Sequence, residues 1–135
     1  EAASVLQGRS VLELGAGLGL CSIVLAHLGA ARVTMTDGES SVVELAAANA
    51  ARNNAAVHAA TLRWGPCETE QAKAVLEAAA ASTVVASDVL YEETGIAEFL
   101  QQARAAGRGM QPCTPGATGP YRNPVGRERP HDSRQ

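Results

Sequence analysis

Short apolar runs alternate with longer segments of helical character along residues 1–105 of the chain. Four runs rich in β-branched and other apolar residues predict strands at residues 10–14, 32–36, 56–63 and 82–87. Helices are predicted at residues 18–28, 39–53, 68–80 and 93–105. In the first of these, the helical spacing is marked by residues 20, 23, 24, 27 and 28. Strands that alternate with helices favour an α/β fold, in which right-handed crossovers build a parallel sheet of about four strands.

The alternating pattern stops near residue 105. Residues 106–135 contain five of the six prolines and five glycines, and they carry a net charge of +3 against −6 for residues 1–105. A segment of this composition cannot bury a core. We therefore expect one partial domain at residues 1–105 and a disordered tail at residues 106–135. The tail's arginines would suit a weak nucleic-acid contact, but no aromatic spacing accompanies them.

Cysteine content and hydropathy indicate an intracellular protein. The three cysteines form no C-x-x-C pair and no metal-ligand spacing, and their odd number gives no disulfide framework. The longest apolar stretch, near residues 16–31, falls short of the ~18 residues that a membrane span needs. We expect a cytoplasmic location, with the nucleus also open. Because the chain begins at Glu1, directly before the first strand, a targeting segment could precede it.

The sequence VLELGAGLGL, residues 11–20, places three glycines where the first predicted strand ends and a helix begins. Glycines such as Gly15 and Gly17 let the backbone turn tightly and let a ligand lie against it. Asp37 ends the second strand, 22 residues after Gly15, where a carboxylate can accept hydrogen bonds from two ribose hydroxyls. The dinucleotide pattern G-x-G-x-x-G would need a glycine in place of Leu20. A nicotinamide dehydrogenase is therefore disfavoured.

Two further motifs follow the glycine turn and Asp37: LRWG at residues 62–65 and SDVLYEE at residues 87–93. Together the four motifs resemble the seven-strand, class I S-adenosylmethionine-dependent methyltransferases. They are most similar to the methyltransferase-like protein-lysine branch, sometimes called methyltransferase family 16. The resemblance covers residue 5 to about residue 100. It implies a Rossmann-like fold, S-adenosyl-L-methionine as cofactor, and a protein lysine ε-amine as methyl acceptor. Small-molecule amines stay open as acceptors.

The resemblance implies contact with the cofactor for several residues at or just after the ends of strands, namely Glu13, Gly15, Gly17, Asp37 and Trp64. The carboxylate of Glu13 could hold the cofactor's ammonium group, directly or through water. Trp64 could lay its indole against the adenine base. Both residues have a structural alternative. Glu13 could cap backbone amides, and Trp64 could be an ordinary half-buried aromatic residue.

Asp88 and Tyr91 match the D-x-x-Y pattern that this branch keeps at the acceptor entrance. The resemblance implies that both are catalytic and that Asp88 also borders the cofactor. Asp88 could accept a hydrogen bond from the lysine amine, and Tyr91 could close the channel or hold the amine. The reaction is an in-line attack of a neutral amine on a sulfonium methyl group, and it needs no metal. As alternatives, Asp88 could cap the next helix and Tyr91 could pack over the sheet edge.

Four predicted strands are fewer than the seven of this family, so the sequence resembles a truncated enzyme. The fourth strand would then keep one unpaired edge. Two hypotheses follow: a methyltransferase that acts on a protein lysine, or a noncatalytic cofactor-binding or interaction fragment whose open edge pairs with a partner chain. We expect a protein substrate as partner, with no nucleic acid and no membrane. The sequence does not indicate an oligomeric state.

Overall fold

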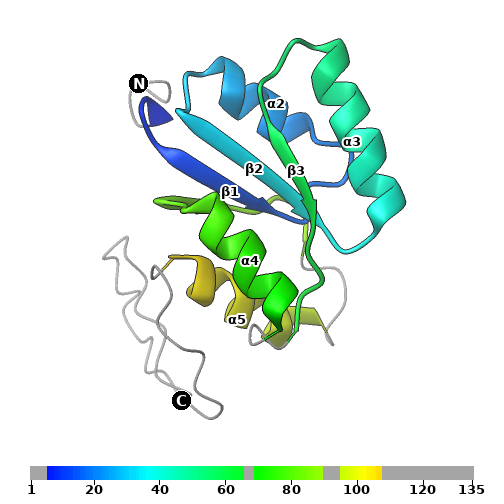
Figure 1. Cartoon of the computed structure of the whole chain (residues 1–135), viewed down its shortest axis with the longest axis vertical. Coiled ribbons are helices and arrows are strands. Elements are labelled where there is room, and N and C mark those ends of the chain that lie inside the picture. The colour runs from blue at the N-terminus through cyan, green and yellow to red at the C-terminus, as the bar shows by residue number, and fades with distance from the viewer. Residues whose placement is uncertain (1–5, 66–68, 90–94, 108–135) are drawn as a thin grey trace, which may run out of the picture.

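The computed structural model describes residues 6–65, 69–89 and 95–107. In these residues strands and helices alternate along the chain (Figure 1). The strands are β1 (Ser10–Leu14), β2 (Arg32–Asp37), β3 (His58–Thr61) and β4 (Thr83–Val85). The helices are α2 (Leu20–His27), α3 (Ser40–Arg52), α4 (Glu70–Ala79) and α5 (Ile96–Gly107). The predicted α/β class and the order of the eight predicted elements are confirmed. The first two residues of the predicted tail instead end helix α5, and Ala106 is buried in the core. The rest of the predicted tail, residues 108–135, lies outside the described residues.

The four described strands form one parallel sheet in the order β3-β2-β1-β4. β1 is central, and its five residues pair with β2 from Ser10 opposite Arg32 to Leu14 opposite Thr36. β3 and β4 are shorter than predicted, because β3 pairs only beside the end of β2 and β4 pairs only with residues 11–13. In a parallel sheet the carboxyl ends of all strands meet at one edge. The four connections that follow β1 to β4 therefore start from the same edge.

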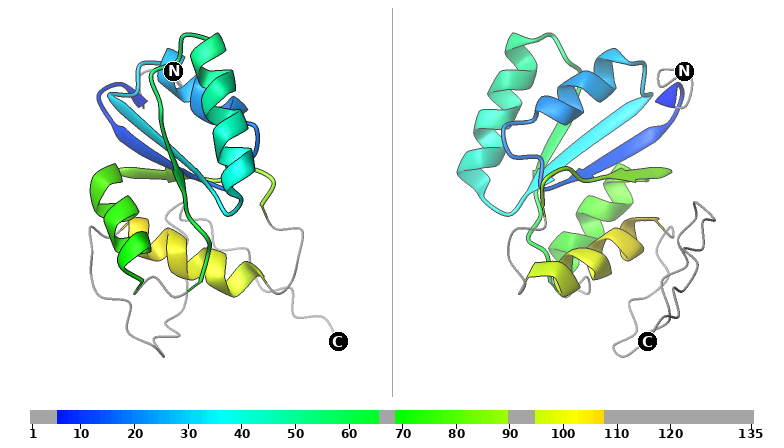
Figure 2. Two further views of the ribbon diagram at one scale, coloured as in Figure 1. Left: turned by 45° about the vertical axis from the view of Figure 1, so that its right-hand side comes forward. Right: turned by 180° about the vertical axis from the view of Figure 1, so that it is seen from behind.

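Two helices cover each face of the sheet, as Figure 2 shows from the side and from behind. Alternate residues of β1 serve the two faces, as the period of two in a strand requires. Leu12 and Leu14 are fully buried in a cluster with Leu76 of α4, while Val11 is buried with Leu25 of α2. The core is thus divided into two layers on either side of a sheet whose central strand is buried on both faces.

Helix α2 buries only part of the face predicted by its apolar spacing. Leu20 is 73% exposed and Val24 is 47% exposed, whereas Ser22, Ile23 and Leu25 are buried. The sequence of α2 is apolar on nearly all sides, so its apolar spacing alone does not determine which face turns inward.

Helix starts depend on residues that the apolar pattern does not reveal. α4 begins at Glu70 because the side-chain oxygen of Thr69 accepts a hydrogen bond from the backbone N–H of Ala72, at 3.2 Å. α3 begins at Ser40, one residue later than predicted, with Glu39 in extended conformation before it. None of the helices in the described part of the chain has the length and apolar character that crossing a membrane would require.

Candidate functional site

The glycine turn between β1 and α2 is built from left-handed backbone conformations. The φ angles are 69° at Gly15, 52° at Gly17 and 83° at Gly19. Residues with a Cβ adopt this region at a cost, which is why glycine is the default residue there. The turn is bound to the neighbouring strand, since the Ala16 N–H donates to the Thr36 carbonyl at 2.8 Å. The backbone therefore passes tightly around the carboxyl end of β1.

Gly15 lies under two side chains from distant parts of the sequence. A Cβ at this position would lie 2.7 Å from Val89 Cγ1 and 3.1 Å from Trp64 Cζ2. The indole of Trp64 also makes an edge-on contact with Phe99 of α5, with ring centroids 5.2 Å apart. Trp64 is half-buried between the glycine turn and α5. The structure thus brings Gly15 and Trp64 together, and this packing is also what an ordinary half-buried aromatic residue would have.

The other two glycines face different surroundings. A Cβ at Gly19 would lie 3.2 Å from Met35 Sδ and 3.2 Å from Ala46 Cβ, so close packing against β2 and α3 requires glycine there. A Cβ at Gly17 would meet no atom within 4 Å. Gly17 is therefore required by its backbone conformation and not by packing, and its α-carbon faces open space.

Asp37 and Gly17 form the contact that joins β2 to the glycine turn. The Gly17 N–H donates to Asp37 Oδ2 at 3.0 Å, and the Glu39 N–H donates to Asp37 Oδ1 at 3.2 Å. A carboxylate offers about four acceptor positions, so each oxygen of Asp37 can accept a further hydrogen bond. Asp37 is half-buried at the carboxyl end of β2. Two predicted site residues, 20 positions apart, are thus in direct contact.

Glu13 is committed to contacts inside the protein. Its side chain is 2% exposed, and its Oε2 accepts a hydrogen bond from the Ser22 hydroxyl in the first turn of α2. Burial raises the pKa of the Glu13 carboxyl, and hydrogen bonds from Ser22 and Cys21 oppose that rise. Burial and the negative charge of Glu13 raise the pKa of the Cys21 thiol to about 11. The position of Glu13 therefore fits the structural alternative, in which its carboxylate caps the start of helix α2.

Sequence reasoning missed Ser22. Within the helical pattern it is one small polar residue among apolar neighbours, and the predicted inner stripe did not include it. The signal that could have found it is its spacing from Glu13, because the carboxylate that ends β1 lies beside the first turn of the following helix.

Asp88 lies at the carboxyl end of β4, three residues after the last paired residue Val85. It is exposed, and its φ of 56° is uncommon for a residue with a side chain, although aspartate tolerates this region better than most. Its neighbour Val89 packs over Gly15, so Asp88 adjoins the glycine turn. Tyr91, the other predicted catalytic residue, lies outside the described residues.

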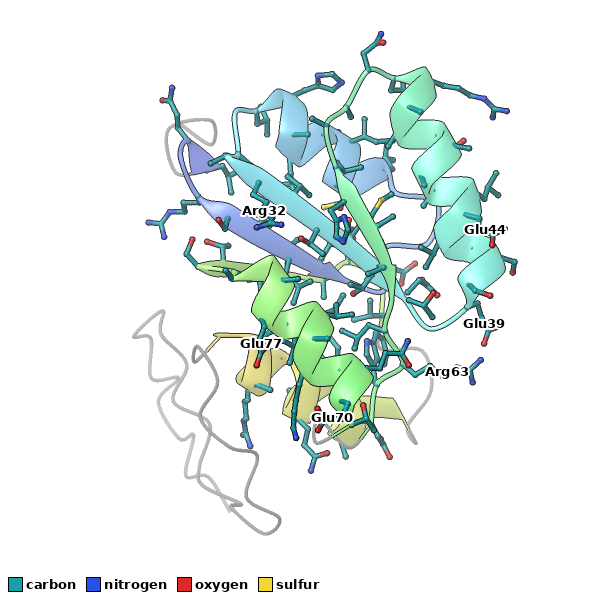
Figure 3. The ribbon with its side chains drawn as sticks, viewed as in Figure 1. Arg32, Glu39, Glu44, Arg63, Glu70 and Glu77 are labelled. Carbon is teal, nitrogen blue, oxygen red and sulfur yellow. The ribbon has the colours of Figure 1, made fainter. Side chains whose placement is uncertain are left out.

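An exposed ion pair lies next to Asp37. Arg63, after β3, donates from its guanidinium to Glu39 Oε1 at 3.0 Å, and both residues are labelled in Figure 3. The two side chains are 75% and 65% exposed, so the pair is held weakly. Among the described residues, no three His, Cys, Asp or Glu side chains are grouped to hold a metal ion.

The comparisons with known proteins agree with this arrangement. Residues 1–104 match the family described as lysine methyltransferase. The chain is 46% identical over 65 residues to a protein N-lysine methyltransferase, METTL21A of Danio rerio, across 44% of this chain and 29% of that protein. It is 42% identical over 53 residues to a ribosomal protein L11 methyltransferase of Sorangium cellulosum (strain So ce56), across 39% of this chain and 17% of that protein. The chain thus spans less than a third of either relative.

Among solved structures, the chain resembles the magnesium protoporphyrin IX methyltransferase of Synechocystis PCC 6803 with bound SAH. The TM-score is 0.59 at 21% identity, over 79% of this chain and 46% of that one. At this identity the likeness shows a shared Rossmann-like methyltransferase fold. The family match covers most of the chain and agrees with the resemblance carried by the four motifs. This chain therefore belongs to the lysine methyltransferase family.

Proposed function

We propose that this chain binds S-adenosylmethionine at the carboxyl ends of β1 and β2 and serves methyl transfer to a lysine ε-amine of a protein. The observation that carries the proposal is the hydrogen bond from Gly17 to Asp37, found in a chain of the lysine methyltransferase family. This hydrogen bond joins the glycine turn to a carboxylate at the end of the second strand, which is the position from which such folds bind a ribose. Two similar proteins, named for methylation of ribosomal protein L11 and of protein lysine, support a protein acceptor.

The residues present fit this cofactor. Asp37 has free acceptor capacity for two ribose hydroxyls, and the open space at Gly17 lets a ligand approach the backbone. The indole of Trp64 offers an aromatic surface for adenine. The carboxylate of Asp37 lies at the turn, and the charge of Arg63 is balanced by Glu39. This electrostatic balance favours a cationic sulfonium over a phosphate-bearing dinucleotide.

The proposed reaction is a methyl transfer by direct displacement. S-adenosylmethionine supplies a methyl group on a positively charged sulfur. A neutral lysine amine attacks the methyl carbon, the N–C bond forms as the C–S bond breaks, the sulfur keeps the electron pair, and the amine then releases a proton to water. The family resemblance supports Asp88 as the group that accepts a hydrogen bond from the amine and orients it, and Tyr91 as the residue that closes the channel or holds the amine. Partial desolvation favours the neutral amine, because it lowers the pKa of lysine.

Calorimetric titration of the full chain with S-adenosylhomocysteine tests the binding step. We expect the wild-type chain to bind, and Asp37→Ala to weaken binding about tenfold or more, since a carboxylate that accepts two ligand hydroxyls is lost. Glu44→Ala is the matched control, because it removes an exposed carboxylate from α3 and is expected to leave binding unchanged. A wild-type chain that does not bind would refute the proposal.

Transfer from methyl-labelled S-adenosylmethionine to lysate proteins tests the catalytic step. We expect label on lysine ε-amines after hydrolysis of the labelled proteins, and a strong loss of label with Asp88→Ala. Binding of S-adenosylhomocysteine without any transfer would refute the catalytic claim and leave the binding claim standing. Label on a residue other than lysine would refute the acceptor class, and full activity of Asp88→Ala would remove Asp88 from the acceptor site.

A further inference from the structure

Helix α2 lacks a cap of its own. Its N-cap residue is Gly19, which makes no side-chain cap hydrogen bond, and its first turn contains no acidic residue. The carboxylate of Glu13, from β1, lies at this N-terminus, where it accepts hydrogen bonds from the Ser22 hydroxyl and from the backbone of Ser22. A negative charge at a helix N-terminus is stabilising, because the unpaired N–H groups of the first turn point toward it.

This contact, here called the Glu13–Ser22 clasp, is sheltered from solvent. Glu13 is 2% exposed and Ser22 is fully buried, and the Cys21 thiol also donates to the carboxylate. The backbone carbonyl of Glu13 accepts from the Thr36 hydroxyl at 2.7 Å, which ties this residue to β2 as well. A buried polar group that loses its hydrogen-bond partner costs free energy, so Glu13 and Ser22 have few other arrangements of similar stability.

The clasp encloses the glycine turn. Its two residues are nine positions apart, and the turn with its three left-handed glycines lies between them. The Gly17 N–H donates to Asp37 at 3.0 Å, and this contact requires one particular backbone conformation of the turn. Glycine residues can adopt many other backbone conformations, so the turn needs a further restraint to stay in this one. A side-chain contact that fixes both ends of such a segment restricts those alternatives.

We propose, resting on the function proposed above, that Ser22 is a positioning residue of the methyl-donor site. Its hydrogen bond to Glu13 holds the glycine turn in the shape that presents Gly17 and Asp37 to S-adenosylmethionine. Glu13 then acts through Ser22 and Cys21, and not by direct contact with the cofactor's ammonium group. Pre-organised turns bind more tightly because less ordering is left for the moment of binding.

Ser22→Ala in the full chain tests the proposal, with Ser82→Ala as the matched control. Ser82 is exposed and its hydroxyl donates to the Ser10 carbonyl at 3.2 Å, far from the turn. We expect Ser22→Ala to weaken binding of S-adenosylhomocysteine about tenfold and to speed amide hydrogen exchange at residues 15–19, while Ser82→Ala changes neither. Glu13→Gln keeps an oxygen that accepts from Ser22, so we expect it to lose only about threefold in affinity.

Direct contact of Glu13 with the cofactor predicts the reverse order, with Glu13→Gln losing far more than Ser22→Ala. That order, or unchanged affinity and exchange in Ser22→Ala, would overturn the proposal. If Ser22→Ala does not fold, Ser22→Cys carries the test, since it fills the same space with a weaker donor, and wild-type affinity in that variant would overturn the proposal. If the wild-type chain binds no S-adenosylhomocysteine, the proposed function fails and the positioning role fails with it, whereas a failure confined to the variants leaves the proposed function intact.

Discussion

Gly15 and Gly17 share a left-handed backbone but differ in what surrounds them, so alanine at each position separates backbone strain from packing. At Gly15 the new methyl group would lie 2.7 Å from Val89 Cγ1 and 3.1 Å from Trp64 Cζ2. At Gly17 it would meet nothing within 4 Å. We therefore predict that Gly15→Ala destabilises the fold more than Gly17→Ala does.

The difference can be sized from the two contributions. Alanine in the left-handed region costs about 1–2 kcal/mol at either position. Pushing a methyl group into packed neighbours adds about 1–3 kcal/mol at Gly15 alone. Gly15→Ala is thus expected to lower the free energy of unfolding by about 2–5 kcal/mol, and Gly17→Ala by about 1–2 kcal/mol. Because Val89 Cγ1 is the nearest atom, Val89→Ala in the Gly15→Ala background should recover about 1 kcal/mol.

Urea unfolding measures these differences, with circular dichroism and the fluorescence of Trp64 as two probes. Trp64 is the single tryptophan of the chain, so Gly15→Ala is also expected to shift its emission in the folded state. Binding of S-adenosylhomocysteine should fall in Gly17→Ala although most stability is kept, because the methyl group enters the space proposed for the ligand. Equal losses of stability for the two variants, or no recovery with Val89→Ala, would refute the packing described at Gly15.

Three further predictions concern charged and titrating groups. Burial raises the pKa of Glu13, so the folded protein binds a proton at this carboxyl more tightly than the unfolded chain does. The free energy of unfolding should therefore fall as the pH rises above about 4.3, until the raised pKa is passed. Urea unfolding of Glu13→Gln should not show this fall with pH, and the same fall in that variant would contradict its origin in Glu13. Since the pKa of Cys21 is about 11, its alkylation at pH 8, followed by mass spectrometry, should be about a hundredfold slower than that of a free thiol of pKa about 8.5. A rate like that of glutathione would contradict this. Glu39→Gln should change stability by less than about 1 kcal/mol, and less still in high salt, because the ion pair with Arg63 is exposed; a larger loss in thermal unfolding would mean that the pair is buried in solution.

The order of elements could be predicted from the sequence because each strand and helix carries its own local pattern. The alternation of short apolar runs and helical segments was enough to predict a parallel sheet with crossover helices, whereas the placement of α2 and α3 on one face and of α4 and α5 on the other was seen only in the structure. Boundaries were less accurate where pairing decides them. β4 ends at Val85, opposite Glu13, because β1 enters the glycine turn just beyond that point.

The candidate site was predicted in part. The contact of Gly17 with Asp37 follows from strand order, since adjacent parallel strands place their carboxyl ends together. The apolar pattern did not predict Ser22, because a small buried polar residue carries less weight in such a pattern than the exposed Leu20 does, and only its spacing from Glu13 pointed to it. The packing of Val89 over Gly15 was also hidden, because it joins residues 74 positions apart outside any regular element.

Amide chemical shifts of the full chain, followed while S-adenosylhomocysteine is added, show whether the ligand binds at the glycine turn. We expect the largest shifts at Gly17 and its neighbours in the turn, at Asp37, and at the side-chain N–H of Trp64. Shifts at another surface, or none at saturating ligand, would contradict it.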